Sequence, residues 1–453
     1  MDLIRSSGPI SRVELVNATG LTQPTISNIV RRLIDDGVVR ETGDTVATRG
    51  KPRAMLVINS RAAYGVGIHV GADTLTCVVT DTRGGTVGRQ LVAAPAAPQH
   101  VGSQHTGAPG GPAGGPSVGG SAGGPLVGGS AGRQFAGGSA GRQRVGGPVG
   151  REIAGGSADG GREGLVDRLA ALYRDVTEGL GLPPQSVAGL AVVGPGPVDV
   201  ARGRFLAPPG LHRPGEPDLA AALTARLGVP VLVDSDAAAA AVGEFWGRQV
   251  SRERTFGCLY MNSGIGSGVV LDGALHRGAS SNAGKLGHIS VARGGRRCPC
   301  GNRGCLEQYA APHVLVARAR VTPGLADRLH IRPDDPDARA FDVLARAAVY
   351  ADPQARALVD ESAALLAEGA ITLANLWDLD TLVLAGPGFA VAGSIYVTEI
   401  RRRLAEWAFA RDVHGVEVDL SSNPRDSAAI GGAALVLQGS VAPGHGPHVA
   451  ARV

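Results

Sequence analysis

The sequence lacks features that mark several classes of protein. No run of about 18 apolar residues is present, so the sequence predicts no membrane-spanning helix. Its first seven residues lack a basic start followed by an apolar core, so no secretory signal is visible and we expect a cytoplasmic protein. Aromatic residues make up only 4% of the chain, so its cores must rest on valine, leucine, isoleucine and alanine.

The net charge is also small, and lysine is rare. A net charge of +4 over 453 residues is too small to indicate a general polyanion binder. Among the 44 basic residues, only Lys51 and Lys285 are lysines. This bias is typical of a high-GC genome and carries no functional prediction by itself.

Glycine, by contrast, is abundant and unevenly spread. About a third of the 69 glycines fall within residues 101–160, where the string GGSAG recurs at residues 119, 128 and 137. Because this stretch has almost nothing to bury, we predict a disordered Gly/Ser/Ala insertion over residues 101–163. A repeat expansion in a surface loop and a partner-binding tether are the two interpretations of it. Residues 441–453 lack periodicity and are predicted to be a flexible tail.

Residues 1–60 are predicted to form a winged helix-turn-helix. Ser11, with Glu14 three positions later, and Thr22 are suitable N-caps for two successive helices. Side chains of Gln, Asn and Arg pair with base edges in the major groove, and a basic wing reaches the DNA backbone. The predicted DNA-binding residues are Thr22, Gln23, Thr25, Asn28, Arg31 and Arg32 on the second helix, and Arg49 and Lys51 in the wing. The alternative is a small helical unit whose polar face is merely solvated.

Three of the five cysteines fall within eight residues and predict a metal site. Cys298, Cys300 and Cys305 lie shortly after His288 in the chain. Three thiolates and one imidazole complete a tetrahedral Zn²⁺ shell, and a full shell is typical of structural zinc. The alternative is a set of unligated thiols. Cys77 and Cys258 lie in predicted strands and are expected to be buried.

Strands and helices alternate after residue 163, and several strands end in glycine-rich turns. The turns at residues 71–73, 263–268 and 385–388 each follow an apolar strand, and backbone N–H groups in such turns cradle phosphates. Together they indicate a nucleotide cleft, or a former one. Asp236 follows another apolar strand, where it is either a general base or a helix N-cap.

These motifs, in this order, resemble the ROK family of repressors and sugar kinases. The resemblance is carried by NAGKLGHISV with CPCGNRGCLEQYA in residues 282–310, and by VVGPGPVD, DSDAAAAAVGE, SGIGSGVVLDGALHRGAS and ANLWDLDTLVLAGPG at residues 192–199, 234–244, 263–280 and 374–388. It covers the chain apart from residues 101–163 and the tail. It implies an α/β protein with an N-terminal winged helix-turn-helix (1–60) and a two-lobed actin-like ATPase/sugar-kinase domain (61–440), assembled as a dimer or tetramer.

The first phosphate turn departs from the pattern of the family's kinases. Where they have Asp-x-Gly-Gly-Thr, this chain has His69 for the Asp, Ala72 for the second Gly and Asp73 for the Thr. A carboxylate aimed at the phosphate pocket repels ATP. We therefore expect no binding of ATP or Mg²⁺ and no kinase activity.

The sugar pocket that the resemblance implies is also altered. Asp236 matches the family's catalytic base, retained here for ligand binding, and His288 and Glu307 match sugar-site positions. Ser235 and Lys285 stand where the family has Asn and Glu. Either the ligand carries an acidic group, or Lys285 pairs with Asp236 or Glu307 and weakens the pocket.

The combined prediction is a transcriptional regulator, most simply a repressor, that binds operator DNA as a homo-oligomer and responds to a sugar-like effector. One alternative is an active ATP-dependent sugar kinase that kept its DNA-binding domain, and another is a DNA-binding protein that senses nothing. The family's first helix begins upstream of residues 3–5, so either this helix is short or the true start precedes Met1.

Overall fold

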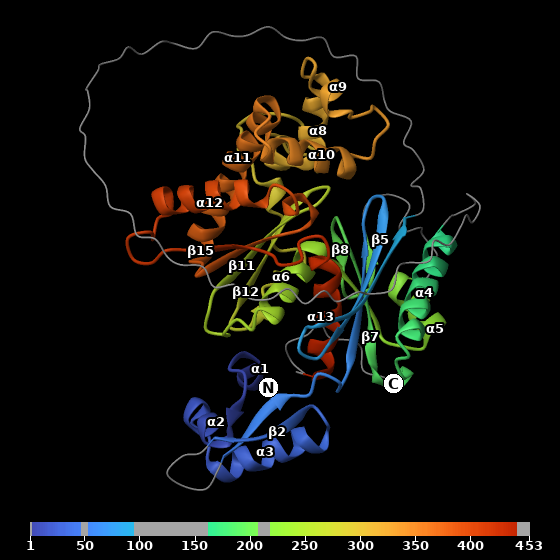
Figure 1. The fold of residues 1–453 in the computed structure, drawn as a ribbon, viewed down its shortest axis with the longest axis vertical. Helices are drawn as coiled ribbons and strands as arrows, with labels where there is room; N and C mark the ends of the chain where they lie inside the picture. Colours follow the sequence, from blue (N-terminus) through green and yellow to red (C-terminus); the bar gives the residue numbers. More distant parts are fainter. Residues whose placement is uncertain (1, 47–52, 95–161, 207–217, 442–453) are drawn as a thin grey trace. The chain divides into compact units, whose positions relative to one another are not determined.

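The computed structural model describes residues 2–46, 53–94, 162–206 and 218–441 (Figure 1). The predicted glycine-rich insertion, apart from residues 162 and 163, and the predicted tail, apart from residue 441, lie outside the described residues. Within the described residues, no helix is both long and apolar enough to cross a membrane.

The N-terminal domain has the predicted helix-turn-helix. Helices α1 (Asp2–Ser6), α2 (Arg12–Thr19) and α3 (Gln23–Asp35) accompany a small sheet in the order β1 (Ile10–Ser11), β3 (Arg53–Ile58), β2 (Val39–Val46). The Ser11 hydroxyl accepts from the Glu14 N–H while the Glu14 carboxylate accepts from the Ser11 N–H, so the expected capping box is present. The Thr22 hydroxyl accepts from the N–H of Thr25 and so caps α3.

The spacing of Ile26, Ile29, Val30 and Leu33 predicts one apolar face on α3, and the structure places one of these residues differently. Ile26 and Val30 are buried against Leu15 and Leu56, but Ile29 is 43% exposed. Helix α3 packs on α2 and a three-stranded sheet, which together cover only a narrow stripe of its surface. The prediction that Ile29 belongs to this core is therefore wrong.

The first lobe is built on a five-stranded sheet. Its order is β10 (Val231–Ser235), β7 (Val187–Gly194), β4 (Tyr64–Val70), β5 (Thr74–Asp81), β6 (Thr86–Ala93). The last three strands form the predicted meander, whereas β7 pairs in parallel with both β4 and β10. Helices α4 (Arg162–Gly179) and α5 (Leu219–Leu227) cover one face of this sheet (Figure 1).

The second lobe has its own five-stranded sheet. Its order is β13 (Ala274–Leu275), β12 (Ile265–Leu271), β11 (Phe256–Met261), β14 (Thr381–Ala385), β15 (Glu417–Leu420). Its main helices are α8 (Pro312–Val321), α10 (Asp337–Val349), α11 (Pro353–Trp377) and α12 (Gly393–Trp407). The glycine-rich pattern predicts a strand over residues 268–271, but the strand begins at Ile265 because pairing with β11 extends to Met261. Glycine is needed at Gly266 and Gly268, because the side chains of Ala237 and Ala241 pack closely against them.

Two helices, α6 (Asp236–Gly247) and α13 (Ser427–Val441), lie between the two sheets (Figure 1). Their backbones approach so closely that a Cβ on Gly431 would overlap the carbonyl oxygen of Ala239. The alanine-rich pattern predicts a helix over residues 236–247, as observed for α6, whereas no local pattern predicts a helix at α13. The mixed α/β fold with a winged helix-turn-helix and two kinase-like lobes is confirmed.

Candidate functional site

The carboxyl end of β10 brings two acidic residues to the start of α6. Asp234 is fully buried and forms an ion pair with Arg277 at 2.9 Å. Ser235 is the N-cap residue, so Asp236 is the first residue of the helix and not its N-cap. One Asp236 oxygen accepts from the N–H of Ala237 at 2.8 Å. Its other oxygen therefore keeps its capacity to accept a hydrogen bond from a ligand.

A histidine from β4, which β7 separates from β10 in the sheet, faces this free oxygen. His69, near the end of β4, is only 4% exposed, and its Nε2 lies 3.8 Å from Oδ2 of Asp236. That nitrogen has no hydrogen-bond partner among the described residues. The His69 that replaces the kinase aspartate is thus next to the predicted ligand-binding carboxylate.

Lys285 reaches the same region from the loop before η2 (Leu286–His288). Its Nζ donates to the carbonyl oxygen of Gly196 at 3.1 Å. Burial lowers the pKa of Lys285, and the carboxylates of Asp236 and Asp234 partly offset that effect. No described carboxylate forms an ion pair with Lys285, so the sequence-based alternative of a direct pair with Asp236 or Glu307 is not observed.

Glu307 begins α7 (Glu307–Ala310), and its carboxylate lies beside Gly264 and Gly287. Its Oε2 accepts from the N–H of Ile265 at 2.9 Å. Gly264 makes this approach possible, because a Cβ there would overlap the Glu307 carboxylate. The second oxygen of Glu307 is left to accept from a ligand.

The predicted metal ligands are brought together. Ligand atoms of His288, Cys298, Cys300 and Cys305 all lie within 4.8 Å of one another. Nδ1 of His288 is 3.6 Å from Sγ of Cys298, and the Sγ atoms of Cys300 and Cys305 are 3.7 Å apart. Tetrahedral zinc, with Zn–S bonds of about 2.3 Å and Zn–N bonds of about 2.0 Å, spaces two sulfurs by about 3.8 Å and sulfur from nitrogen by about 3.5 Å. The donor set and spacing therefore fit a zinc ion.

The loop around these ligands depends on glycine. Gly304 has a φ of +74°, and a Cβ there would overlap the carbonyl oxygen of Ala292. Gly301 has a φ of +95° but open space around its missing side chain. His288 ends η2, and Cys305 lies two residues before Glu307, so the cluster of His288 and the three cysteines brings together the segments that carry Lys285 and Glu307.

The three predicted glycine turns do meet in one cleft. A cavity of about 460 Å³ is lined by residues of all three turns, among them Asp73, Ser263 and Gly388, and by His69. Two ion pairs lie in its wall, Arg89 with Asp426 and Arg425 with Asp342, each at 2.7 Å. Both arginines are thus engaged by protein carboxylates, and Asp73 stays exposed at the turn where a kinase holds phosphate.

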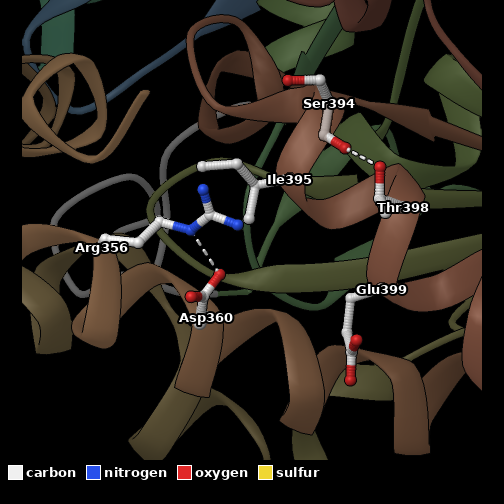
Figure 2. Close-up of a pocket in the computed structure, with 6 residues that line it drawn as sticks. All are labelled: Arg356, Asp360, Ser394, Ile395, Thr398 and Glu399. Carbon is white, nitrogen blue, oxygen red and sulfur yellow. Dashed lines mark hydrogen bonds and ion pairs between the residues drawn. The ribbon is translucent and has the colours of Figure 1, made fainter. Parts of the chain in front are cut away.

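Another hollow, of about 530 Å³, lies between α11 and α12 (Figure 2). Arg356 and Asp360 form an ion pair across one side of it, and Thr398 donates to the carbonyl oxygen of Ser394 on the other. None of the predicted ligand-binding residues lines it. Its polar groups are already paired within their own helices, so we do not assign a ligand to it.

The predicted recognition helix presents its polar residues to solvent. Thr22 is exposed at the N-cap of α3, and the predicted α3 residues are exposed along it: Gln23, Thr25, Asn28, Arg31 and Arg32. Arg49 and Lys51 lie outside the described residues. This face has the shape and chemistry of a major-groove reader.

Two residues at the site were missed by sequence reasoning. Arg277 neutralises Asp234 from a loop more than 40 residues away, and no local pattern marks it. Tyr260 is fully buried in β11, where burial and the Asp236 carboxylate hold the pKa of its hydroxyl well above the usual range. Both belong to the second lobe and meet the first lobe's acids only in the folded chain.

A family model described as "ROK family" matches residues 157–439, well over half of the chain. The chain belongs to the ROK family. A second model, "Winged helix-turn-helix DNA-binding", matches residues 1–40 of this ROK protein. Together the matches agree with the fold described above.

Among named relatives, the xylose repressor of Bacillus subtilis is 26% identical over 313 residues, which cover 69% of this chain and 65% of that protein. The xylose repressor of Caldicellulosiruptor bescii is 22% identical and covers 94% of this chain and 92% of its own. The glucokinase of Streptomyces coelicolor is 29% identical over 60% of this chain and 85% of its own.

Solved structures confirm the fold. A ROK family transcriptional regulator described as a homologue of the E. coli MLC protein superposes with a TM-score of 0.63 at 22% identity, covering 96% of this chain and 93% of its own. A ROK glucokinase from Streptomyces griseus, in complex with glucose and AMPPNP, gives a TM-score of 0.59 at 24% identity over 83% of this chain and all of its own.

Proposed function

We propose that this ROK protein is a transcriptional regulator, acting as a repressor, whose affinity for operator DNA responds to a sugar or sugar derivative. The observation that carries the proposal is the exposed polar face of α3, on a winged helix-turn-helix joined to a sugar-kinase-like module. The named repressors that it resembles support the same conclusion. Double-stranded DNA is then the macromolecular partner and the sugar is the effector.

The test starts from DNA fragments of the host genome that the purified protein retains. A gel shift then measures its affinity for a retained fragment with and without each member of a sugar panel. We expect specific binding that at least one sugar changes. If DNA binds but no sugar shifts either the DNA affinity or the melting temperature, the protein is a DNA-binding protein without an effector.

We propose a structural zinc at His288, Cys298, Cys300 and Cys305. The ligand spacing supports it, and a full shell leaves no open position for catalysis. A bound zinc would tie the segment of Lys285 to the segment of Glu307. Its role is therefore to hold the two sides of the effector pocket at a fixed distance.

We propose that the protein is not a kinase. The carboxylate of Asp73 stands at the phosphate turn, and the two arginines in the cleft wall are already paired with Asp426 and Asp342. Both arginines among the described lining residues are paired, so an ATP phosphate chain entering this cleft meets the negative charge of Asp73 without an unpaired arginine or lysine there to offset it. The cleft is then a remnant of a nucleotide site.

The second candidate function, an ATP-dependent sugar kinase with a DNA-binding domain, is favoured by one observation. Asp236 keeps a free carboxylate oxygen at the position of a general base, and some relatives are named glucokinases. Purified protein incubated with ATP, Mg²⁺ and a sugar panel decides between the two. Sugar-dependent formation of ADP would overturn the non-catalytic proposal.

We also propose a homo-oligomer, a dimer or a tetramer. Leu376, Phe409 and Val413 are 71%, 86% and 86% exposed, and the Phe409 N–H donates to the side chain of Asn375, so these apolar groups gather near the end of α11. Exposed apolar groups that cluster in this way mark interaction surfaces. Two copies of the recognition helix also match the two half-sites of a palindromic operator.

A further inference from the structure

The geometry points to an effector that is an anionic sugar: a sugar-sized polyol carrying a carboxylate or a phosphate, whose anionic group binds Lys285 and whose hydroxyls bind Asp236 and Glu307. This inference rests on the proposed function, because it names the chemical class of the effector for the same pocket. It separates this chain from regulators of neutral sugars.

The first step is the position of the Lys285 ammonium. The segment before Lys285 is held against β12, where Ser267 donates through its backbone N–H to the carbonyl oxygen of Gly284 at 2.7 Å. Gly284 has a φ of +83°, and a Cβ there would overlap the Ser267 carbonyl oxygen. Strand β12 in turn packs on the first turn of α6 through Gly266 and Ala237. The main chain of Lys285 is thereby fixed close to the start of α6, where Asp236 lies.

The second step is the hydrogen-bonding capacity that Lys285 retains. Its ammonium has three donors, and its one hydrogen bond in the described chain goes to the carbonyl oxygen of Gly196. Burial lowers the pKa of Lys285, so its charged form lacks full compensation in the free protein. A ligand that brings a negative group would supply the missing acceptor and the missing charge.

The third step is the state of the neighbouring acids. Asp234 is already neutralised by Arg277, so it does not compete for the ammonium. Asp236 and Glu307 each give one oxygen to a backbone N–H and keep the other. Free carboxylate oxygens accept from hydroxyl groups, which explains why the ligand must be a polyol as well as an anion.

His69 is a second buried group near Asp236 with unused hydrogen-bonding capacity. Its buried Nε2 is without a hydrogen-bond partner in the described chain and faces Oδ2 of Asp236 at 3.8 Å. The Lys285 ammonium interacts electrostatically with the Asp236 carboxylate, which offsets part of the negative charge that an anionic ligand would meet. The pocket therefore tolerates negative charge in spite of its two ligand-binding acids.

A purely structural role for Lys285 makes a different prediction. The neighbouring Asn282 also contacts the first lobe, accepting from the Val198 N–H at 2.9 Å and donating to the Val198 carbonyl oxygen at 2.8 Å. If Lys285 only ties Gly196 to this segment, its removal changes stability and leaves the preference among ligands unchanged. The two roles are therefore separable by a binding measurement.

The test is calorimetric binding to the full-length protein of glucose, glucosamine, gluconate, glucuronate, galacturonate and glucose 6-phosphate. We expect at least one anionic sugar to bind about tenfold or more tighter than glucose, which corresponds to about 1.4 kcal/mol. Carboxylates and phosphates in the panel distinguish the two sources of negative charge. Equal or tighter binding of glucose or glucosamine, or no binding by any anionic sugar, would overturn the inference.

Two variants make the test specific. Lys285→Met keeps the length of the side chain and should remove the preference for anionic sugars, whereas Lys285→Arg should retain most of it. Both should give the far-UV circular dichroism spectrum of the parent protein, which shows that they fold. An unchanged preference in Lys285→Met would refute the assignment. If anionic sugars bind tightly but leave DNA affinity unchanged, the ligand class stands and the proposed regulatory function fails.

Discussion

At the scale of single residues, the proposed metal site depends on ligand chemistry at Cys300 and on backbone geometry at Gly304. Cys300 is an exposed residue of the proposed metal site, and its removal leaves three donors and no large cavity. Gly304 offers no ligand atom, yet a Cβ there would overlap the Ala292 carbonyl oxygen and disturb the loop that carries the proposed ligands. Substitutions at the two positions should therefore both lose metal, for different reasons.

The Cys300→Ser variant is expected to lower zinc content well below one ion per chain and to lower the melting temperature. A loss of about 2 kcal/mol corresponds to a decrease of roughly 3 °C for a domain of about 300 folded residues. Arg297→Ser, at an exposed position of the same loop, is the matched control and should keep both values. Zinc analysis with a thermal melt checks this, and parental zinc content in Cys300→Ser would refute the ligand assignment.

The pair Gly304→Ala and Gly301→Ala isolates the steric requirement. Both positions have positive φ, so both variants carry a backbone cost of about 1–2 kcal/mol. Only Gly304→Ala adds an overlap with the Ala292 carbonyl oxygen, so we expect it to lose zinc while Gly301→Ala retains most of it. Equal zinc contents in the two variants would show that the close approach at Gly304 is unimportant.

At the scale of elements, α6 connects the pocket with the DNA-binding domain. Its first residue is Asp236, and its last turn receives the side chain of Arg5 from α1. The Arg5 guanidinium donates to the carbonyl oxygens of Trp246 at 3.1 Å and Val250 at 3.4 Å, and it lies over the Trp246 ring. A cation stabilises a helix C-terminus, so this contact is favourable. A shift of α6 would move these carbonyl oxygens and thereby change the environment of α1.

Replacing Arg5 with Met should weaken the coupling between sugar and DNA. We expect the affinity for the sugar to remain near the parental value. The ratio of the DNA affinities measured with and without the sugar should fall toward one. Couplings of this kind are typically 1–3 kcal/mol, or about 5- to 150-fold. Arg12→Met, which removes an exposed ion pair with Glu41 in the same domain, is the control. A full sugar response in Arg5→Met would exclude this contact from the coupling.

Helix α3 should supply the DNA contacts. The double variant Arg31→Ala with Arg32→Ala is expected to reduce operator affinity by about 1–3 kcal/mol for each lost base contact, or to lower the salt slope by about 1 for each lost phosphate contact. Arg61→Ala with Arg83→Ala removes the same charge from exposed positions outside α3. Gel shifts at several salt concentrations check this, and equal affinities for both double variants would exclude those α3 contacts.

The elements also show how far the sequence could predict the structure. The capping signals at Ser11 and Thr22 and the cysteine spacing act over a few residues, so local patterns revealed them. Helix α13 was missed because it is apolar all round, as a helix between two sheets must be, and shows no periodic face. The exposure of Ile29 and the partnership of Arg277 with Asp234 depend on distant segments, which no local pattern encodes.

At the scale of the whole molecule, the kinase-like fold carries an altered charge pattern in its cleft. The glycine turns still form one cleft, but its arginines are paired with Asp426 and Asp342, and Asp73 stands at the first turn. The proposed effector pocket has Asp236, Glu307 and Lys285, and the His/Cys cluster lies beside it in the chain. This combination supports the proposal that the protein senses a ligand and does not transfer phosphate to it.

The most direct test of this account is the affinity of the full-length protein for a selected genomic fragment, measured by fluorescence anisotropy as a sugar is added without ATP. The account predicts that a sugar changes the dissociation constant by about fivefold or more, with an anionic sugar most effective. A DNA affinity that no sugar alters, together with ATP-dependent phosphorylation of a sugar by the same preparation, would contradict it.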